Sequence, residues 1–114
     1  MRIDLHTHSA ASDGLLRPAA LVQAVREARL DIFSLTDHDT TDALAEVGVH
    51  ARDLGLRLIP GIELSAFWRK RVEVHILGYF LDPGDAMLNA FLKDRRGARR
   101  TRLQAMLSRL CSLG

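Results

Sequence analysis

Short apolar runs alternate with longer amphipathic stretches along most of the chain. Four stretches have the length and spacing of buried or half-buried strands: 3–5, 32–35, 56–59 and 72–76. Apolar residues recur at helical spacing over 18–29 and again over 44–54. The predicted order is strand, helix, strand, helix, strand, strand, helix, which favours an α/β fold with mostly parallel strands.

Turn and cap residues separate these elements. Pro18 suits the first turn of a helix. Arg17 precedes it at a position where Thr or Ser would cap the helix, and losing such a cap costs on the order of 1 kcal/mol. Gly55 is well placed to end the second helix. The candidates for the N-cap of that helix are Thr40, Thr41 and Asp42.

The second half of the chain is less regular. Pro60-Gly61 and then 62–65 follow the third strand, and we expect a polar turn over 68–71. Apolar stripes recur over 88–92 and after Gly97. We expect two helical segments, or one helix interrupted at Gly97, where glycine costs about 1 kcal/mol relative to alanine.

Composition is that of one small globular domain. The chain has 114 residues, of which 47% are hydrophobic and 26% charged. No apolar run approaches the roughly 18 to 20 residues that span a bilayer, and no basic leader precedes an apolar stretch, so the default location is the cytoplasm. The single cysteine, Cys111, allows neither an internal disulfide nor a thiolate zinc site.

Charge is unevenly distributed although the net charge is only +2. Residues 93–109 hold seven basic side chains against Asp94 alone, which gives +6 and leaves −4 for the remainder. This asymmetry favours an anionic partner, and a solvated basic helix face is the alternative. The basic residues are Lys93, Arg95, Arg96, Arg99, Arg100, Arg102 and Arg109.

Histidines cluster where the predicted strands end. His6 and His8 are two residues apart, so an extended backbone projects both to the same side. His38 and Glu63 follow the second and third strands, and His75 lies in the fourth. Because the carboxyl ends of strands carry the site in α/β folds, we expect these side chains to converge.

The converging residues have the chemistry of a metal site. Neutral imidazoles mixed with carboxylates such as Asp13, Asp37 and Glu63, without a thiolate, suit Mn²⁺, Fe²⁺ or Zn²⁺. A carboxylate like Glu63 can bridge two cations. Bridged metals roughly 3.5 to 4 Å apart can activate water and neutralise charge on a phosphoryl oxygen. This combination predicts hydrolysis of a phosphoester.

Each residue also has a simpler explanation. Asp13 beside Gly14 could be a turn residue, and Asp37 and Asp39 could cap the following helix. His50, on the second helix, lies away from every strand end. Glu63 is harder to explain in this way, because a carboxylate between apolar neighbours is costly to bury without a cation or hydrogen-bond partners.

Five motifs resemble, in order, those of the polymerase and histidinol phosphatase (PHP) superfamily. They are His6-Thr7-His8-Ser9, Asp13-Gly14, Thr36-Asp37-His38-Asp39-Thr40, Pro60-Gly61-Ile62-Glu63 and Val74-His75-Ile76-Leu77-Gly78-Tyr79. The resemblance implies a distorted seven-stranded (βα) barrel, similar to a TIM barrel, of which residues 1–114 would be the amino-terminal part. Residues 1–80 would supply metal-binding strands and helices, and 85–114 a basic helical segment.

The resemblance also implies up to three divalent ions, commonly manganese, iron or zinc. His6 and His8 would bind the first metal, and Glu63 would bridge it to a second that His75 also holds. Metal-bound water would be the attacking group, so no side-chain nucleophile is needed. The motifs are most similar to those of stand-alone phosphoesterases that hydrolyse nucleoside 3′,5′-bisphosphates or short RNA.

Further residues receive roles from the same resemblance. Asp13 and His38 would bind a third metal, and Asp37 and Asp39 would orient ligands. Arg99 and Arg102, one helical turn apart, could fork onto a substrate phosphate.

One departure from the family concerns length. Complete relatives are more than twice as long and supply later metal ligands, so a chain ending at Gly114 would lack at least one ligand for each metal. We expect half a barrel with uncovered strand edges and apolar faces, which needs the missing half or another chain. The alternatives are a truncated, catalytically weak fragment that binds metal or assembles, and the same fold acting on histidinol phosphate or a DNA 3′ end.

Overall fold

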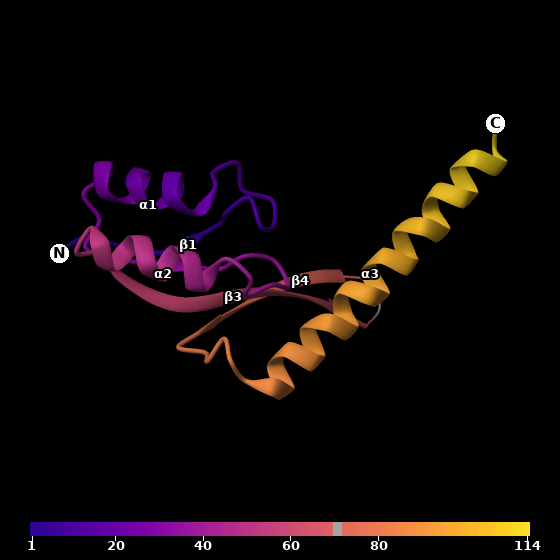
Figure 1. Cartoon of the computed structure of the whole chain (residues 1–114). Helices are drawn as coiled ribbons and strands as arrows, with labels where there is room; N and C mark the ends of the chain where they lie inside the picture. The colour runs from indigo at the N-terminus through magenta and orange to yellow at the C-terminus, as the bar shows by residue number, and fades with distance from the viewer. Residues whose placement is uncertain (70–71) are drawn as a thin grey trace. The chain divides into compact units, whose positions relative to one another are not determined.

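The computed structural model describes residues 1–69 and 72–114, and its elements follow the predicted order (Figure 1). They are β1 (Ile3–Thr7), α1 (Pro18–Glu27), β2 (Ile32–Leu35), α2 (Leu44–Asp53), β3 (Arg57–Trp68), β4 (Val72–Tyr79) and α3 (Ala86–Ser112). The chain forms two compact units, Met1–Pro83 and Gly84–Gly114.

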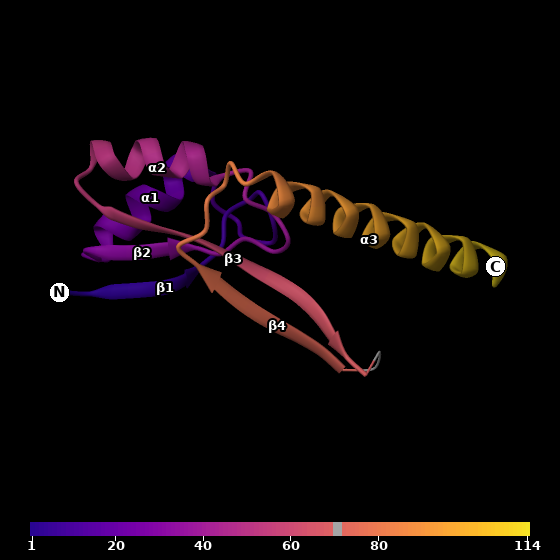
Figure 2. The ribbon, with the colours of Figure 1, turned by 90° about the horizontal axis from the view of Figure 1, so that it is seen from below.

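The strands of the first unit form one mixed sheet in the order β1-β2-β3-β4. β1 pairs with β2 and β2 with β3 in parallel, while β4 returns antiparallel to β3. α1 and α2 lie side by side over one face of the parallel strands (Figure 2). The prediction of an α/β fold with mostly parallel strands is confirmed, and the carboxyl ends of β1, β2 and β3 share one edge.

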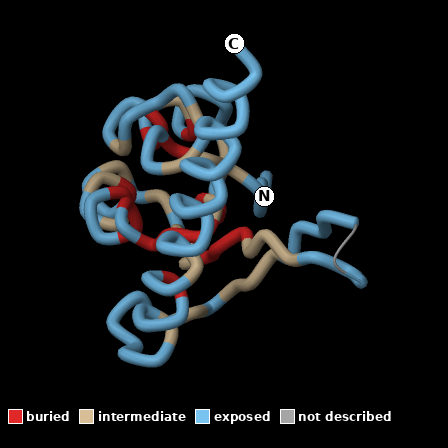
Figure 3. Tube along the Cα trace, turned by 90° about the vertical axis from the view of Figure 1, so that its right-hand side faces the viewer, coloured by how far each residue is buried: buried red, intermediate tan, exposed pale blue. Residues whose placement is uncertain are grey.

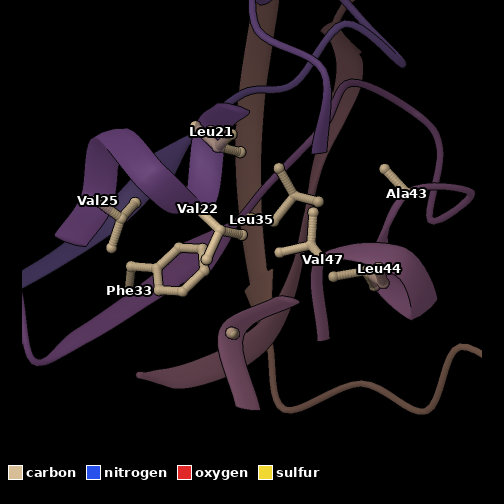
Figure 4. Packing of buried hydrophobic residues seen from close by; sticks show 9 residues of the cluster. Leu21, Val22, Val25, Phe33, Leu35, Ala43, Leu44 and Val47 are labelled. Atoms are coloured by element: carbon tan, nitrogen blue, oxygen red, sulfur yellow. The ribbon is translucent and has the colours of Figure 1, made fainter. Parts of the chain in front are cut away.

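The hydrophobic core lies between this pair of helices and β2 (Figure 4). Phe33 and Leu35, two residues apart on β2, are almost fully buried, and Val22 and Val47 bring α1 and α2 onto them. Burying one such side chain stabilises the fold by about 1.5 to 3 kcal/mol. This packing holds the end of β2 in place, directly before the Thr36-Asp37-His38-Asp39 segment.

The helix ends differ in part from the predictions. α1 ends at Glu27 rather than Arg29, because Arg29 adopts a left-handed φ of 56° that cannot continue a helix. Gly55 has a φ of 68° directly after α2, as predicted for a residue that ends a helix.

The predicted N-caps of α2 are wrong. The N-cap is Ala43, and no side chain caps the helix. The hydroxyl of Thr40 instead accepts a hydrogen bond from the backbone N–H of Asp42. This local turn uses the Thr40 side chain before the helix begins.

β3 is longer than predicted, because it continues through Pro60-Gly61 without a break. Pairing with β4 begins at Gly61, so the missing N–H of Pro60 removes no hydrogen bond from that ladder. Along the β3–β4 hairpin, β3 changes from buried at the base to exposed at the tip, and β4 changes from intermediate to exposed (Figure 3). Of the turn predicted over 68–71, Trp68 belongs to β3, and Lys70 and Arg71 lie outside the described residues.

The second unit contains α3, which passes through Gly97 as a single helix, so the predicted interruption is wrong. One glycine costs less than starting a new helix, and extension past it is favourable. Asp85 caps the helix by accepting a hydrogen bond from the N–H of Leu88 at 2.7 Å. Among the described residues, no helix is both long enough and apolar enough to cross a membrane.

Candidate metal centre

A buried carboxylate, that of Glu63, occupies the middle of the site. Its side chain is only 5% exposed, and it lies within β3 between two apolar neighbours. Backbone hydrogen bonds fix its position: the Glu63 N–H donates to the Asp37 carbonyl at 3.1 Å, and the Asp39 N–H donates to the Glu63 carbonyl at 2.9 Å. The segment after β2 is therefore bonded to β3 on both sides of His38, which places His38 beside Glu63.

Four imidazoles surround this carboxylate. Nε2 of His6 and Nε2 of His8 lie 2.9 and 3.0 Å from Oε2 of Glu63. Nε2 of His38 lies 3.5 Å from the same oxygen, and Nδ1 of His75 lies 2.9 Å from Oε1. Successive rings are 4.8 to 5.0 Å apart between centroids. The structure thus brings together side chains from β1, β3 and β4 and from the loops that follow β1 and β2.

Asp13 approaches the same cluster from the loop after β1. Its Oδ1 lies 2.9 Å from Nδ1 of His8, and its Oδ2 lies 3.4 Å from Nε2 of His38. His8 therefore presents one ring nitrogen to Asp13 and the other to Glu63. Asp13 lies on the exposed side of the cluster, with 65% of its side chain accessible.

The electrostatics of both carboxylates favour their charged forms. Burial by itself would raise the pKa of Glu63, but the hydrogen bond with His6 and the charges of the neighbouring imidazoles outweigh it and lower that pKa. For Asp13, burial is likewise outweighed, chiefly by His8 and His38, and its pKa is also lowered. Negative charge at these two positions is what a cation site requires.

The donor atoms converge closely enough to share a cation. Within residues 1–69 and 72–114, three trios have donor atoms within 4.8 Å of one another: His6, His8 and Glu63; His8, Asp13 and His38; and His38, Glu63 and His75. Together they contain the six predicted metal ligands. Because His8, His38 and Glu63 each belong to two trios, the division of these residues among individual metals stays a prediction.

The other two predicted carboxylates hold backbone segments. Asp37 is buried and accepts hydrogen bonds from Ser9 and Ser12. Asp39 is also buried, has a left-handed φ of 51°, and accepts a hydrogen bond from the Ser65 N–H. Neither caps α2, whose N-cap is Ala43.

The remaining candidates belong to none of the three trios. Arg99 and Arg102 are exposed on α3, in the second unit, and their role in binding substrate stays a prediction. His50 lies on α2, 3.8 Å from Glu46 one turn earlier, as expected for a histidine outside the site.

Sequence reasoning missed three residues that support the cluster. Ser9 belongs to the first motif but received no role, and nothing in the pattern pointed to Ser12. Tyr79 closes the last motif, and its hydroxyl donates to the Leu5 carbonyl at 3.0 Å, which ties β4 to β1 near His6. These contacts join residues distant in the sequence, so periodicity carries no signal for them.

An α/β sheet with an imidazole–carboxylate cluster at its strand ends defines the class of protein. The chain belongs to the PHP domain family, whose model matches residues 4–104. It is 40% identical over 109 residues to the 5′-3′ exoribonuclease Rnm of Escherichia coli, an alignment that covers 94% of this chain and 37% of that protein. It is 38% identical to a 3′,5′-nucleoside bisphosphate phosphatase of Chromobacterium violaceum, covering 98% and 39%.

Solved structures share the fold. An amidohydrolase from Chromobacterium violaceum, determined with bound sulfate and no metal, superposes with a TM-score of 0.89 at 38% identity, covering all of this chain and 40% of that one. A protein of Bifidobacterium adolescentis assigned as a metal-dependent phosphoesterase gives a TM-score of 0.87 at 31% identity, covering 97% and 39%. The chain spans about two fifths of the length of the curated relatives described above.

Proposed function

We propose that this protein is a metal-dependent phosphoesterase that hydrolyses phosphate esters of nucleotides. The observation that carries the proposal is the Glu63 carboxylate, almost fully buried and within 3.5 Å of four imidazoles from three segments of the chain. Imidazole nitrogens and carboxylate oxygens that converge in this way are the donor arrangement that a divalent cation requires. Membership in the PHP family and the names of the similar proteins support the same conclusion.

The donor set fits divalent cations. Four imidazoles and two carboxylates, without a thiolate, suit manganese first and iron or zinc as alternatives. We assign His6, His8, Asp13, His38, Glu63 and His75 as ligands. Bound cations would supply an acidic water and neutralise charge on the phosphoryl oxygens. Asp37 and Asp39 keep the segments around these ligands in place.

The substrate class follows from the similar proteins and from the charge of the chain. One relative is named for RNA and another for nucleoside 3′,5′-bisphosphates, and both substrates carry phosphate esters of ribose. Arg99 and Arg102, within the +6 segment of α3, are proposed to bind a substrate phosphate. Substrates of this kind imply the cytoplasm as the place of action.

The test is whether turnover depends on the metal ion and on the residues proposed to bind it. Phosphate release from a nucleoside 3′,5′-bisphosphate, and cleavage of a short 5′-phosphorylated RNA, are measured while Mn²⁺ is titrated. We expect activity that requires Mn²⁺ and is lost on chelation. Binding of Mn²⁺ without turnover of either substrate would instead support a protein that only binds metal.

A pair of histidine variants provides the matched comparison. His6→Ala removes a proposed ligand, so manganese occupancy and activity should fall together. Loss of a residue that only orients a ligand costs roughly 10- to 100-fold, and loss of the ligand itself should cost at least as much. His50→Ala removes an imidazole outside the cluster and should change neither quantity. Unchanged occupancy in His6→Ala would show that the ligand assignment is wrong.

A further inference from the structure

The loop between β1 and α1 folds back on the end of β1. The N–H groups of Ser12 and Gly14 donate to the Ser9 carbonyl at 3.1 and 3.0 Å, and the Ala10 N–H donates to the Leu16 carbonyl at 2.8 Å. Asp13, the exposed member of the cluster, lies in this loop rather than on a strand. Something other than the sheet must therefore hold Asp13 toward the histidines.

The buried carboxylate of Asp37 accepts hydrogen bonds from this loop. It is 2% exposed and accepts three hydrogen bonds: from the Ser9 N–H at 2.7 Å, the Ser9 hydroxyl at 2.6 Å and the Ser12 hydroxyl at 2.7 Å. Hydrogen bonds to an ionised group are short and strong, and they offset the cost of burying its charge. Asp37 follows β2, so these bonds attach the loop to the neighbouring strand end.

The hydroxyl of Ser12 is the contact nearest to Asp13 in this network. The hydroxyl donates to Asp37 at 2.7 Å, and Oδ1 of Asp13 is a second, more distant acceptor of the same proton. The same oxygen lies 3.3 Å from Oδ1 of Asp13 and 3.5 Å from Nδ1 of His8. Ser12 therefore lies against both of the groups that meet at 2.9 Å, the Asp13 carboxylate and the His8 ring.

We propose that Ser12, held by Asp37, is a positioning residue. It fixes the position of the Asp13 carboxylate in the metal centre, and the other proposed ligands are positioned without it. The proposal rests on the proposed function, because it assumes that the cluster binds metal. Of the three trios, only that of His8, Asp13 and His38 contains Asp13. Strands place His6, Glu63 and His75, and backbone hydrogen bonds to β3 place His38. Loss of the Ser12 hydroxyl should weaken metal binding at the site that includes Asp13 and leave metal binding at the other sites unchanged.

The experiment measures binding of Mn²⁺ alone by calorimetry, with metal content after dialysis as a second readout. We expect Ser12→Ala to lower the affinity of one class of sites by about tenfold or more, with the other sites and the melting temperature of the metal-free protein unchanged. Ser12→Thr keeps the hydroxyl and should restore that class. The matched control is Ser34→Ala, which removes a buried hydroxyl that has no hydrogen-bond partner among the residues that the structure describes.

The outcomes separate this inference from the proposed function. An isotherm of Ser12→Ala identical to that of the unaltered protein overturns the positioning role while the metal site stands. Uniform weakening of all sites together with a lower melting temperature also overturns it, since that result means only general damage to the fold. If the unaltered protein binds no Mn²⁺, the proposed function itself fails.

Discussion

At the scale of single residues, the site depends on the close approach of the Gly14 backbone to the His8 backbone. A Cβ at Gly14 would lie 2.3 Å from the carbonyl oxygen of His8, which real Cβ atoms do not tolerate, so Gly14→Ala must push the loop away from β1. Forcing atoms into a packed region costs about 1 to 3 kcal/mol. We expect chemical denaturation to show a loss of that size, and Asp13, the preceding residue, to move away from His8.

Gly48→Ala is the matched comparison for this substitution. The nearest atom to a Cβ at Gly48 is Leu58 Cδ2 at 3.7 Å, an ordinary contact, and the position lies within α2. Alanine favours a helix over glycine by about 1 kcal/mol, so this variant should be as stable as the unaltered protein or more so. Equal effects at the two positions would contradict the proposed role of the Gly14 contact.

At the scale of elements, α1 begins without a side-chain cap. Its N-cap is Arg17, whose side chain makes no capping hydrogen bond and puts positive charge beside the positive end of the helix. Arg17→Ser should provide an acceptor for a free N–H of the first turn and stabilise the protein by about 1 kcal/mol. The measurement is the free energy of unfolding by urea.

The origin of that gain can be checked with Arg17→Ala. Alanine removes the positive charge but supplies no acceptor. If the serine hydroxyl caps the helix, Arg17→Ser should be more stable than Arg17→Ala by most of the expected difference. Equal stability of the two variants would show that charge alone was responsible.

At the scale of the whole molecule, the proposed metal centre joins segments that are otherwise separate in the chain. Its six proposed ligands come from β1, β3, β4 and the loops after β1 and β2, so a bound cation should favour the folded state. Metal at about 100 times its dissociation constant contributes about 2.7 kcal/mol per site, which corresponds to about 10 to 20 °C for a domain of this size. Adding Mn²⁺ should raise the melting temperature, and chelation should lower it again.

The His6→Ala variant tests whether this stabilisation comes from the proposed centre. Its shift with Mn²⁺ should be smaller than that of the unaltered protein under the same conditions. A shift of the same size would place the stabilising cation elsewhere in the molecule.

Much of the architecture could be predicted from the sequence because its causes are local. The spacing of apolar residues determines whether a segment can bury one face as a helix or a strand, and that spacing predicted the order of strands and helices. Parallel strands place their carboxyl ends along one edge, so the positions of His6, His8, His38 and Glu63 in the chain already indicated a shared site. Element ends were less predictable, as at Arg29 and Ala43, because single backbone conformations decide them.

The tertiary structure alone decided how these residues meet. No spacing indicates that Glu63 lies between four imidazoles, that Asp13 faces both His8 and His38, or that Ser12 and Asp37 hold the loop. These contacts join segments separated by up to 57 residues, and they depend on how helices pack and strands pair. The sequence by itself determined which side chains could bind a cation and at which end of the sheet. The packing of the core determined which of them lie close together.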